Sequence, residues 1–199
     1  MCAGRKNLII VFILFFLFYS DYVFARLVIN EVLYDSPGVD TGCFVELTGQ
    51  PGMNLDEYYL LGINGGSGKE YNRIELAGYE IPHDGYFVVA QDNSVENADV
   101  VNPKVNFQNG PDNILLYMGN EIADAVGYGD FVDNNFAGEG EPTLDISGYS
   151  IGRRPDGLDT DNNQMDFVVF SVITPGRPNT PAFLIERSKY TFTVWSAIR

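Results

Sequence analysis

The stretch that decides the fold reads SIGRRPDGLDTDNNQMDF over residues 150–167 and closes with TPGRPN at residues 174–179. It contains a short strand pattern, an acidic and amide-rich loop, a second strand pattern and a stop rich in Pro and Gly. Alternation of apolar and polar residues with a period of two is typical of a half-buried β-strand, and Pro, Gly, Asn and Asp end such strands. The stretch therefore predicts two strands joined by a loop, and the loop holds a cluster of carboxylates dense enough to suggest a metal.

The same kind of pattern recurs along the whole chain. Strand-like segments lie at residues 27–34, 44–47, 58–63, 71–76, 86–90, 113–118, 121–126, 149–152 and 167–172. Between two of them, Gly119 and Asn120 can supply the positive φ of a tight turn between antiparallel strands. Short strands at this spacing, with no long amphipathic helical pattern and no linker, predict a single all-β domain built as an antiparallel sandwich or barrel.

The first 25 residues have the plan of a secretory signal. Arg5 and Lys6 precede an apolar run over residues 8–19, and VFA at residues 23–25 offers residues of the kind that a signal peptidase reads. The run is shorter than the ~20 residues that a helix needs to cross a bilayer. We therefore expect cleavage after Ala25 and a secreted, extracellular chain with no membrane span. An uncleaved signal anchor is the alternative.

The composition excludes one class of partner. The formal net charge is −15, and loss of Arg5, Lys6 and Asp21 with the signal removes two positive charges and one negative, which gives about −16. Nucleic-acid affinity comes largely from Lys and Arg that displace counterions, so we expect no nucleic-acid partner. Cys43 is the single cysteine after the signal, so an internal disulfide of the cleaved chain is impossible. We expect this residue to be a small buried hydrophobe, and an intermolecular bridge is the alternative.

Four passages together resemble the lamin tail domain family. VINEVLY at residues 28–34 resembles the opening strand of the family, and FVEL at residues 44–47 resembles its second strand. ADAVGYG at residues 123–129 is similar to its Asp-x-Val-x-Tyr-Gly segment. Residues 150–179 resemble its Gly-Arg, Asp-rich and Thr-Pro-Gly-x-Pro-Asn ending. The resemblance covers residues 27–179, which is nearly the whole chain after the signal.

The resemblance implies an immunoglobulin-like β-sandwich over residues 26–179, followed by a tail at residues 180–199. Such domains occur alone or attached to secreted nucleases and other surface enzymes, where they are thought to bind or tether. The expected function is a secreted, non-catalytic interaction or adhesion module whose partner is a protein or a glycan at a cell surface or in the matrix. The nuclear members' chromatin and nuclear-envelope roles are not carried over, because this chain has a signal segment, an acidic character and no coiled coil.

The tail differs from the domain in character. Residues 190–195 alternate between polar and apolar side chains, and the tail as a whole is basic. It is interpreted as an added edge strand, a segment that docks a partner or a frayed end.

The acidic loop suggests calcium. Six Asp and Asn side chains lie within eleven residues, and five of them are taken as candidate ligands: Asp156, Asp159, Asp161, Asn163 and Asp166. The sixth is Asn162. Calcium takes six to eight oxygen ligands in flexible geometry. The spacing departs from an EF-hand loop, however, because a loop starting at Asp159 has Gln164 at the glycine position and Phe170 at the bidentate Glu position. The alternative is an Asx-rich turn whose side-chain oxygens bind neighbouring backbone amides.

A hydrolase is the alternative function. Glu31 and Glu46 lie on the first two predicted strands, and Arg153 and Arg154 lie on a late one. Two carboxylates ~5 to 9 Å apart in a cleft can serve as general acid and base. The same residues can form a structural network in which an Arg forks onto one Glu, because an unpaired charge in an apolar strand is costly. A cleft open to solvent would favour the enzyme, and burial against Arg153 would remove it.

Aromatic side chains are plentiful, and most of them are expected in the core of a sandwich. An exposed platform of such rings can stack on sugars or anchor a protein partner. The candidates for either place include Tyr58, Tyr59, Tyr71, Tyr79, Tyr86, Tyr117, Tyr128, Phe131 and Phe136.

Overall fold

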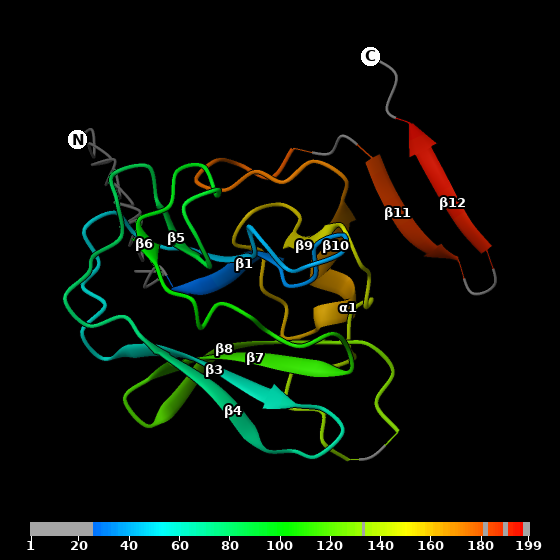
Figure 1. Ribbon diagram of the computed structural model, residues 1–199, viewed down its shortest axis with the longest axis horizontal. Helices are drawn as coiled ribbons and strands as arrows, with labels where there is room; N and C mark the ends of the chain where they lie inside the picture. The colour runs from blue at the N-terminus through cyan, green and yellow to red at the C-terminus, as the bar shows by residue number, and fades with distance from the viewer. Residues whose placement is uncertain (1–25, 133, 181–182, 189–190, 197–199) are drawn as a thin grey trace, which may run out of the picture.

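Two β-sheets packed face to face form the molecule (Figure 1). The computed structural model describes residues 26–132, 134–180, 183–188 and 191–196, so the predicted signal at residues 1–25 lies outside the described residues. The strands of both sheets pair antiparallel, except that β5 and β6 are parallel. The predicted all-β sandwich is confirmed, and its two-layer form fits the immunoglobulin-like expectation.

The larger sheet contains eight strands and carries both ends of the described chain. Its order is β12 (Thr191–Ser196), β11 (Phe183–Ser188), β10 (Phe167–Phe170), β9 (Ser150–Arg153), β1 (Val28–Leu33), β2 (Phe44–Thr48), β5 (Tyr86–Ala90) and β6 (Val100–Val101). Strands β1, β2 and β9 are therefore neighbours at the centre of the sheet although more than a hundred residues separate β2 from β9. This topology brings the first two passages of the family-like signature beside the last one.

The smaller sheet contains four strands in the order β4 (Glu70–Glu75), β3 (Tyr58–Asn64), β7 (Asp112–Met118) and β8 (Glu121–Tyr128). Met118 pairs with Glu121 across the β7–β8 turn, where Gly119 has a φ of 59°. The tight turn predicted at this position is confirmed, with positive φ at Gly119 but not at Asn120. A single helical turn, α1 (Asn163–Asp166), lies between β9 and β10 and contacts β8.

The nine predicted strand segments all appear, with ends shifted by a few residues. The sequence did not predict β6 or α1. The tail had three open interpretations, and its described part forms a hairpin that extends the large sheet. Val169 pairs with Ile185 and Phe170 with Leu184, and the β11–β12 ribbon then projects beyond the sandwich (Figure 1). Among the described residues, no helix is long and apolar enough to cross a membrane.

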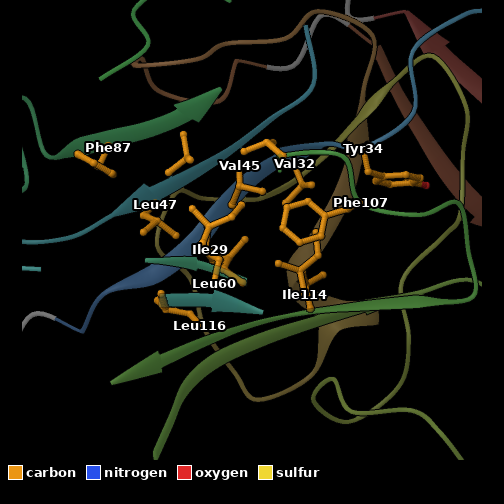
Figure 2. Close-up of a cluster of buried hydrophobic side chains, with 14 of the residues drawn as sticks. Ile29, Val32, Tyr34, Val45, Leu47, Leu60, Phe87, Phe107, Ile114 and Leu116 are labelled. Carbon is orange, nitrogen blue, oxygen red and sulfur yellow. The ribbon is translucent and has the colours of Figure 1, made fainter. Parts of the chain in front are cut away.

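The core lies between the two sheets (Figure 2). Ile29, Val45 and Leu47 of the large sheet face Leu60 and other apolar side chains of the small sheet, and all four are fully buried. Alternate residues of each strand point inward because strand side chains have a period of two. Cys43 is fully buried, as predicted.

A β-bulge in β1 sets up the polar side of the large sheet. The pairing of β1 with β2 shifts register between Ile29 and Glu31, and the next core residue after Ile29 is Val32. A bulge inserts one extra residue and re-aims side chains. Asn30 and Glu31 are thereby both turned from the core toward the outer face, where a later segment of the chain covers them.

Candidate functional site

Residues 174–179, here called the strap, cross the outer face of the large sheet and are held there by Glu31. The Glu31 carboxylate accepts hydrogen bonds from Ser150 Oγ at 2.5 Å and from Thr174 Oγ1 at 2.9 Å. The backbone N–H of Thr174 donates to it at 3.1 Å. One carboxylate on β1 therefore joins β9 and the beginning of the strap.

Glu46 holds the middle of the strap in the same way. Its carboxylate accepts hydrogen bonds from Asn30 Nδ2 at 2.8 Å and from the backbone N–H of Gly176 at 2.7 Å. Glu31 and Glu46 occupy facing positions on β1 and β2. The two residues proposed as an acid–base pair do lie together, and both hold the strap against the large sheet.

Asp156 holds the end of the strap. Its carboxylate accepts hydrogen bonds from the Tyr86 hydroxyl at 2.8 Å and from the backbone N–H of Asn179 at 3.1 Å. Asn30 Nδ2 lies 3.4 Å from Asp156 Oδ1, and Asn30 Oδ1 accepts from the N–H of Gly157. This first candidate calcium ligand thus belongs to the strap network rather than to the rest of its loop.

The carboxylates of Glu31 and Glu46 are buried, and burial raises the pKa of both. Glu31 and Glu46 are both 0% exposed. Burial raises the pKa of Glu46 to about 8, although the bonds from Asn30 and Gly176 oppose that rise. Burial likewise raises the pKa of Glu31, against its bonds from Ser150 and Thr174. Neither carboxylate makes an ion pair with a described residue, so the proposed fork of Arg153 onto one of them is replaced by N–H and O–H donors.

Arg153 instead organises a second buried network on the core side of β9. Its guanidinium lies 2.7 Å from Asp124 Oδ1, 3.1 Å from Asp166 Oδ2 and 3.4 Å from Asp159 Oδ1. It also donates to the backbone carbonyl of Ile29 at 2.9 Å. The side chains of Arg153, Asp124 and Asp166 are all 0% exposed.

Arg26 closes this network from the solvent side. It pairs with Asp159, lies 3.6 Å from Asp161 Oδ1 and 3.9 Å from Glu139 Oε1, and donates to the carbonyl of Ala123. The Arg153 cluster, defined as Arg153 with Asp124, Glu139, Asp159 and Asp166, thus holds four carboxylates around one buried guanidinium. Arg26 supplies a second positive charge at its edge, which leaves the cluster acidic.

Three of these carboxylates lie close enough together to hold one metal ion. Ligand atoms of Asp124, Glu139 and Asp159 all lie within 4.8 Å of one another. Burial raises the pKa of Glu139 to about 8, with Asp124 and Asp159 adding to the rise. Burial also raises the pKa of Asp124, and Arg153 opposes that rise. Asp124 and Glu139 were not predicted as site residues, although Asp124 stands in the family-like passage at residues 123–129.

The five candidate calcium ligands are distributed over different contacts. Asp156 holds the strap, while Asp159 and Asp166 bind Arg153. Asp161 is exposed, and Asp161 N–H donates to Asp159 Oδ1 at 3.2 Å. Asn163 is buried, and its Oδ1 accepts from the N–H groups of Gly127 and Glu139. Asx-type bonds of this kind agree with the turn interpretation, and calcium binding by the loop stays a prediction.

The two networks join all four family-like passages in space. Asn30 and Glu31 come from the first passage, Glu46 from the second and Asp124 from the third. Arg153 and the strap come from the last. These residues contact one another rather than a shared cavity, so the signature describes how this sandwich is held together.

Beside the strap lies an open depression of about 540 Å³, here called the acidic groove. Its lining residues come from two loops, β5 and the strap: Asp84, Tyr86, Glu96, Asn97, Ala98, Asp99, Gly176 and Arg177. Arg177 Nη2 lies 3.0 Å from Glu96 Oε2, and both side chains are largely exposed. Three carboxylates against one guanidinium give the groove a negative charge. No motif in the sequence indicated it, because its residues are scattered over about ninety positions.

Comparison with protein-family models, with curated proteins and with solved structures finds no match to this chain. The class that the fold and the site define is a β-sandwich braced by two buried charge networks.

Proposed function

We propose that this chain is a secreted, non-catalytic interaction or adhesion module of lamin-tail type. The particular partner is a protein or glycan at a cell surface or in the matrix. The family rests on the signature passages of the sequence, and the location rests on the signal predicted at residues 1–25. The function rests on the burial and contacts of the predicted acid–base pair.

The observation that carries the proposal is the enclosure of Glu31 and Glu46. A general acid or base must come within hydrogen-bond reach of the proton that it transfers. Both carboxylates are fully buried, and their oxygens are occupied by Ser150, Asn30 and the strap. A substrate would have to displace the strap to reach them. This geometry favours a structural role for the pair and a binding function for the protein.

The spatial convergence of the signature supports the family type. Four passages that resemble lamin tail domains in sequence order supply the residues of two connected networks. A chance resemblance of separate passages has no reason to produce mutual contacts. The fold expected from the resemblance is also the observed architecture of two packed sheets.

Charge narrows the chemistry of the partner. The chain carries a formal charge of −15, and the acidic groove concentrates Asp84, Glu96 and Asp99 at one place. Complementary charge steers association and suppresses like-charged partners. A partner that presents basic groups fits this surface better than an anionic polymer does.

Binding of the labelled mature chain, starting at Arg26, to cells and extracted matrix tests the proposal. We expect saturable binding that the triple variant Asp84→Asn, Glu96→Gln, Asp99→Asn weakens. A matched control is the triple variant Glu57→Gln, Glu80→Gln, Glu121→Gln, which removes three exposed charges elsewhere. Activity on a panel of glycoside, peptide and phosphoester substrates that is lost in a folded Glu46→Gln variant would establish the hydrolase instead.

A further inference from the structure

A second pocket lies at the end of the sandwich where β8 leaves the small sheet. It has a volume of about 490 Å³, within the ~300–1,000 Å³ range of small-ligand sites. Its lining residues, here called the aromatic pocket, are Gly129, Asp130, Phe131, Phe136, Gly140, Glu141, Pro142 and Gln164. None of the residues of the two buried networks lines it. The pocket combines two aromatic rings, two carboxylates and an amide, and its lining contains no Lys or Arg.

The two rings are arranged as a corner. The ring centroids of Phe131 and Phe136 are 5.1 Å apart, and their planes meet at 69°. Both side chains are only partly buried, although an isolated Phe on a loop would gain free energy by entering the core. Two ring faces that meet near a right angle can approach one compact group from two sides.

Glycines fix the rings in this position. A Cβ added to Gly127 would come within 2.4 Å of the Phe136 ring, and one added to Gly138 would come within 2.7 Å. A Cβ added to Gly65 would come within 2.6 Å of the Phe131 ring. The rings therefore lie directly on glycine backbone. A binding group held in place before the ligand arrives loses less conformational entropy on binding.

The loop that carries the pocket is also anchored at several points. Gly129 N–H donates to the Thr143 carbonyl at 3.0 Å, and Gln164 N–H donates to the Glu141 carbonyl at 2.9 Å. Asn113 Oδ1 accepts from Ala137 N–H at 2.8 Å. These bonds connect both sides of the pocket to β7, β8 and α1.

The combination of aromatic faces and carboxylates selects a cation. The face of an aromatic ring carries partial negative charge and attracts an ammonium group within about 6 Å of its centroid. Exposed Asp130 and Glu141 add formal negative charge. A neutral sugar can stack on the same rings, but it gains nothing from the two charges. An anion is repelled by them.

We propose that the aromatic pocket binds an alkylated ammonium group. This inference rests on the proposed binding function and specifies the chemistry of one contact. The group can come from a basic side chain of a partner protein or from a quaternary ammonium headgroup of choline type. Phe131 and Phe136 contact its alkyl substituents, and Asp130 and Glu141 supply the opposite charge. Gln164 offers an amide oxygen to any N–H that remains.

Titration of the mature chain, followed by backbone amide NMR, tests the proposal. The probes are tetramethylammonium, choline and the trimethylated form of Nα-acetyl-lysine amide, and the control is 3,3-dimethylbutan-1-ol, which has the shape of choline without its charge. We expect saturable shifts centred on Gly129 and Gly140 with the cations, and at least about tenfold weaker binding of the neutral alcohol, because that ratio is the effect of a partly desolvated cation–π contact.

Variants locate the site. Phe131→Leu keeps apolar volume but removes the ring, and Glu141→Gln keeps shape but removes the charge. We expect each to weaken binding of tetramethylammonium several-fold, while Glu121→Gln at the other end of β8 leaves it unchanged. Glu141 and Glu121 are both exposed, so these two variants retain the fold even where a Phe variant does not.

The proposal is overturned if the neutral alcohol binds as tightly as choline, or if cation shifts are spread over the acidic surface and persist in Phe131→Leu and Glu141→Gln. Tighter binding of the lysine derivative assigns the pocket to a protein partner, and tighter binding of choline assigns it to a headgroup. If the aromatic pocket binds no ammonium group, the result of the cell and matrix binding assay is unaffected. Failure of that assay with intact ammonium binding removes the adhesion function alone.

Discussion

The strap network and the Arg153 cluster bury carboxylates in two different ways. Within the described part of the chain, Glu31 and Glu46 pair with no cation and accept hydrogen bonds from N–H and O–H donors. Asp124 and Asp166 lie at ion-pair distance from one guanidinium. A buried charge that lacks a counter-charge tends to take up a proton, whereas a paired charge depends on its partner staying in place. Both networks should respond to pH, because the pKa of Glu139 in the Arg153 cluster is also raised to about 8, but only the second network should respond strongly to loss of Arg153.

Replacement of Arg153 by Met should give the largest effect. It leaves Asp124 and Asp166 buried without a counter-charge, which typically costs about 3–5 kcal/mol of unfolding free energy. Urea denaturation followed by fluorescence measures the loss. Arg154→Met is the matched control because Arg154 is exposed one residue away, and its change should stay below about 0.5 kcal/mol. Similar values for the two variants would show that Arg153 does not stabilise the fold.

Truncation of Glu31 should have a smaller effect. Glu31→Ala leaves the buried donors of Ser150 and Thr174 without an acceptor, at a cost of about 1–3 kcal/mol. Hydrogen exchange of the Thr174 and Gly176 amides should become faster, because the strap loses one of its attachments. Glu96→Ala removes an exposed partner of Arg177 and should change stability by less than about 1 kcal/mol. Unchanged exchange in Glu31→Ala would mean that the strap is held by other contacts.

The pH dependence of stability tests the raised pKa of Glu46. The folded pKa of Glu46 is raised from its ordinary value of 4.5 to about 8, so the folded state binds a proton more tightly than the unfolded state does. Its stabilising contribution is complete below about pH 4.5 and is lost as the pH rises through about 8. We expect a higher thermal midpoint at pH 5 than at pH 8.5. Glu46→Gln should show a shallower dependence than the wild type, and equal slopes would contradict the raised pKa.

Calcium should give the smallest effect, and Arg26 is the residue that decides it. Arg26 pairs with Asp159 and lies near Asp161 and Glu139, so an ion in the acidic loop must compete with a guanidinium. Arg26→Met removes that competitor, and millimolar calcium should then stabilise the variant by about 1 kcal/mol more than the wild type. Thermal melting with calcium and with chelator measures the difference. An equal stabilisation of both proteins by calcium would show that Arg26 does not compete with the ion.

The sequence by itself determined the strands, the β7–β8 turn and the burial of Cys43. These features depend on local chemistry: the alternation of residues along Phe44–Thr48, the positive φ of Gly119 and the apolar character of a thiol. Residues 28–34 and 150–179 resemble parts of one family signature, and that resemblance stays a prediction. The local sequence pattern is sufficient to predict a structural feature when the interactions that produce it lie within a few residues.

Only the tertiary structure decided which carboxylates share a site. Asp156 and Asp159 are three residues apart, yet one binds the strap and the other binds Arg153. Asp124 and Glu139 join Asp159 from other parts of the chain, and Phe131 meets Phe136 over Gly65, Gly127 and Gly138, which are far apart in the sequence. Sheet order and the bulge in β1 set these contacts, and both depend on pairing between distant strands. Composition showed that the loop was acidic, but its counter-charges are fixed by long-range packing.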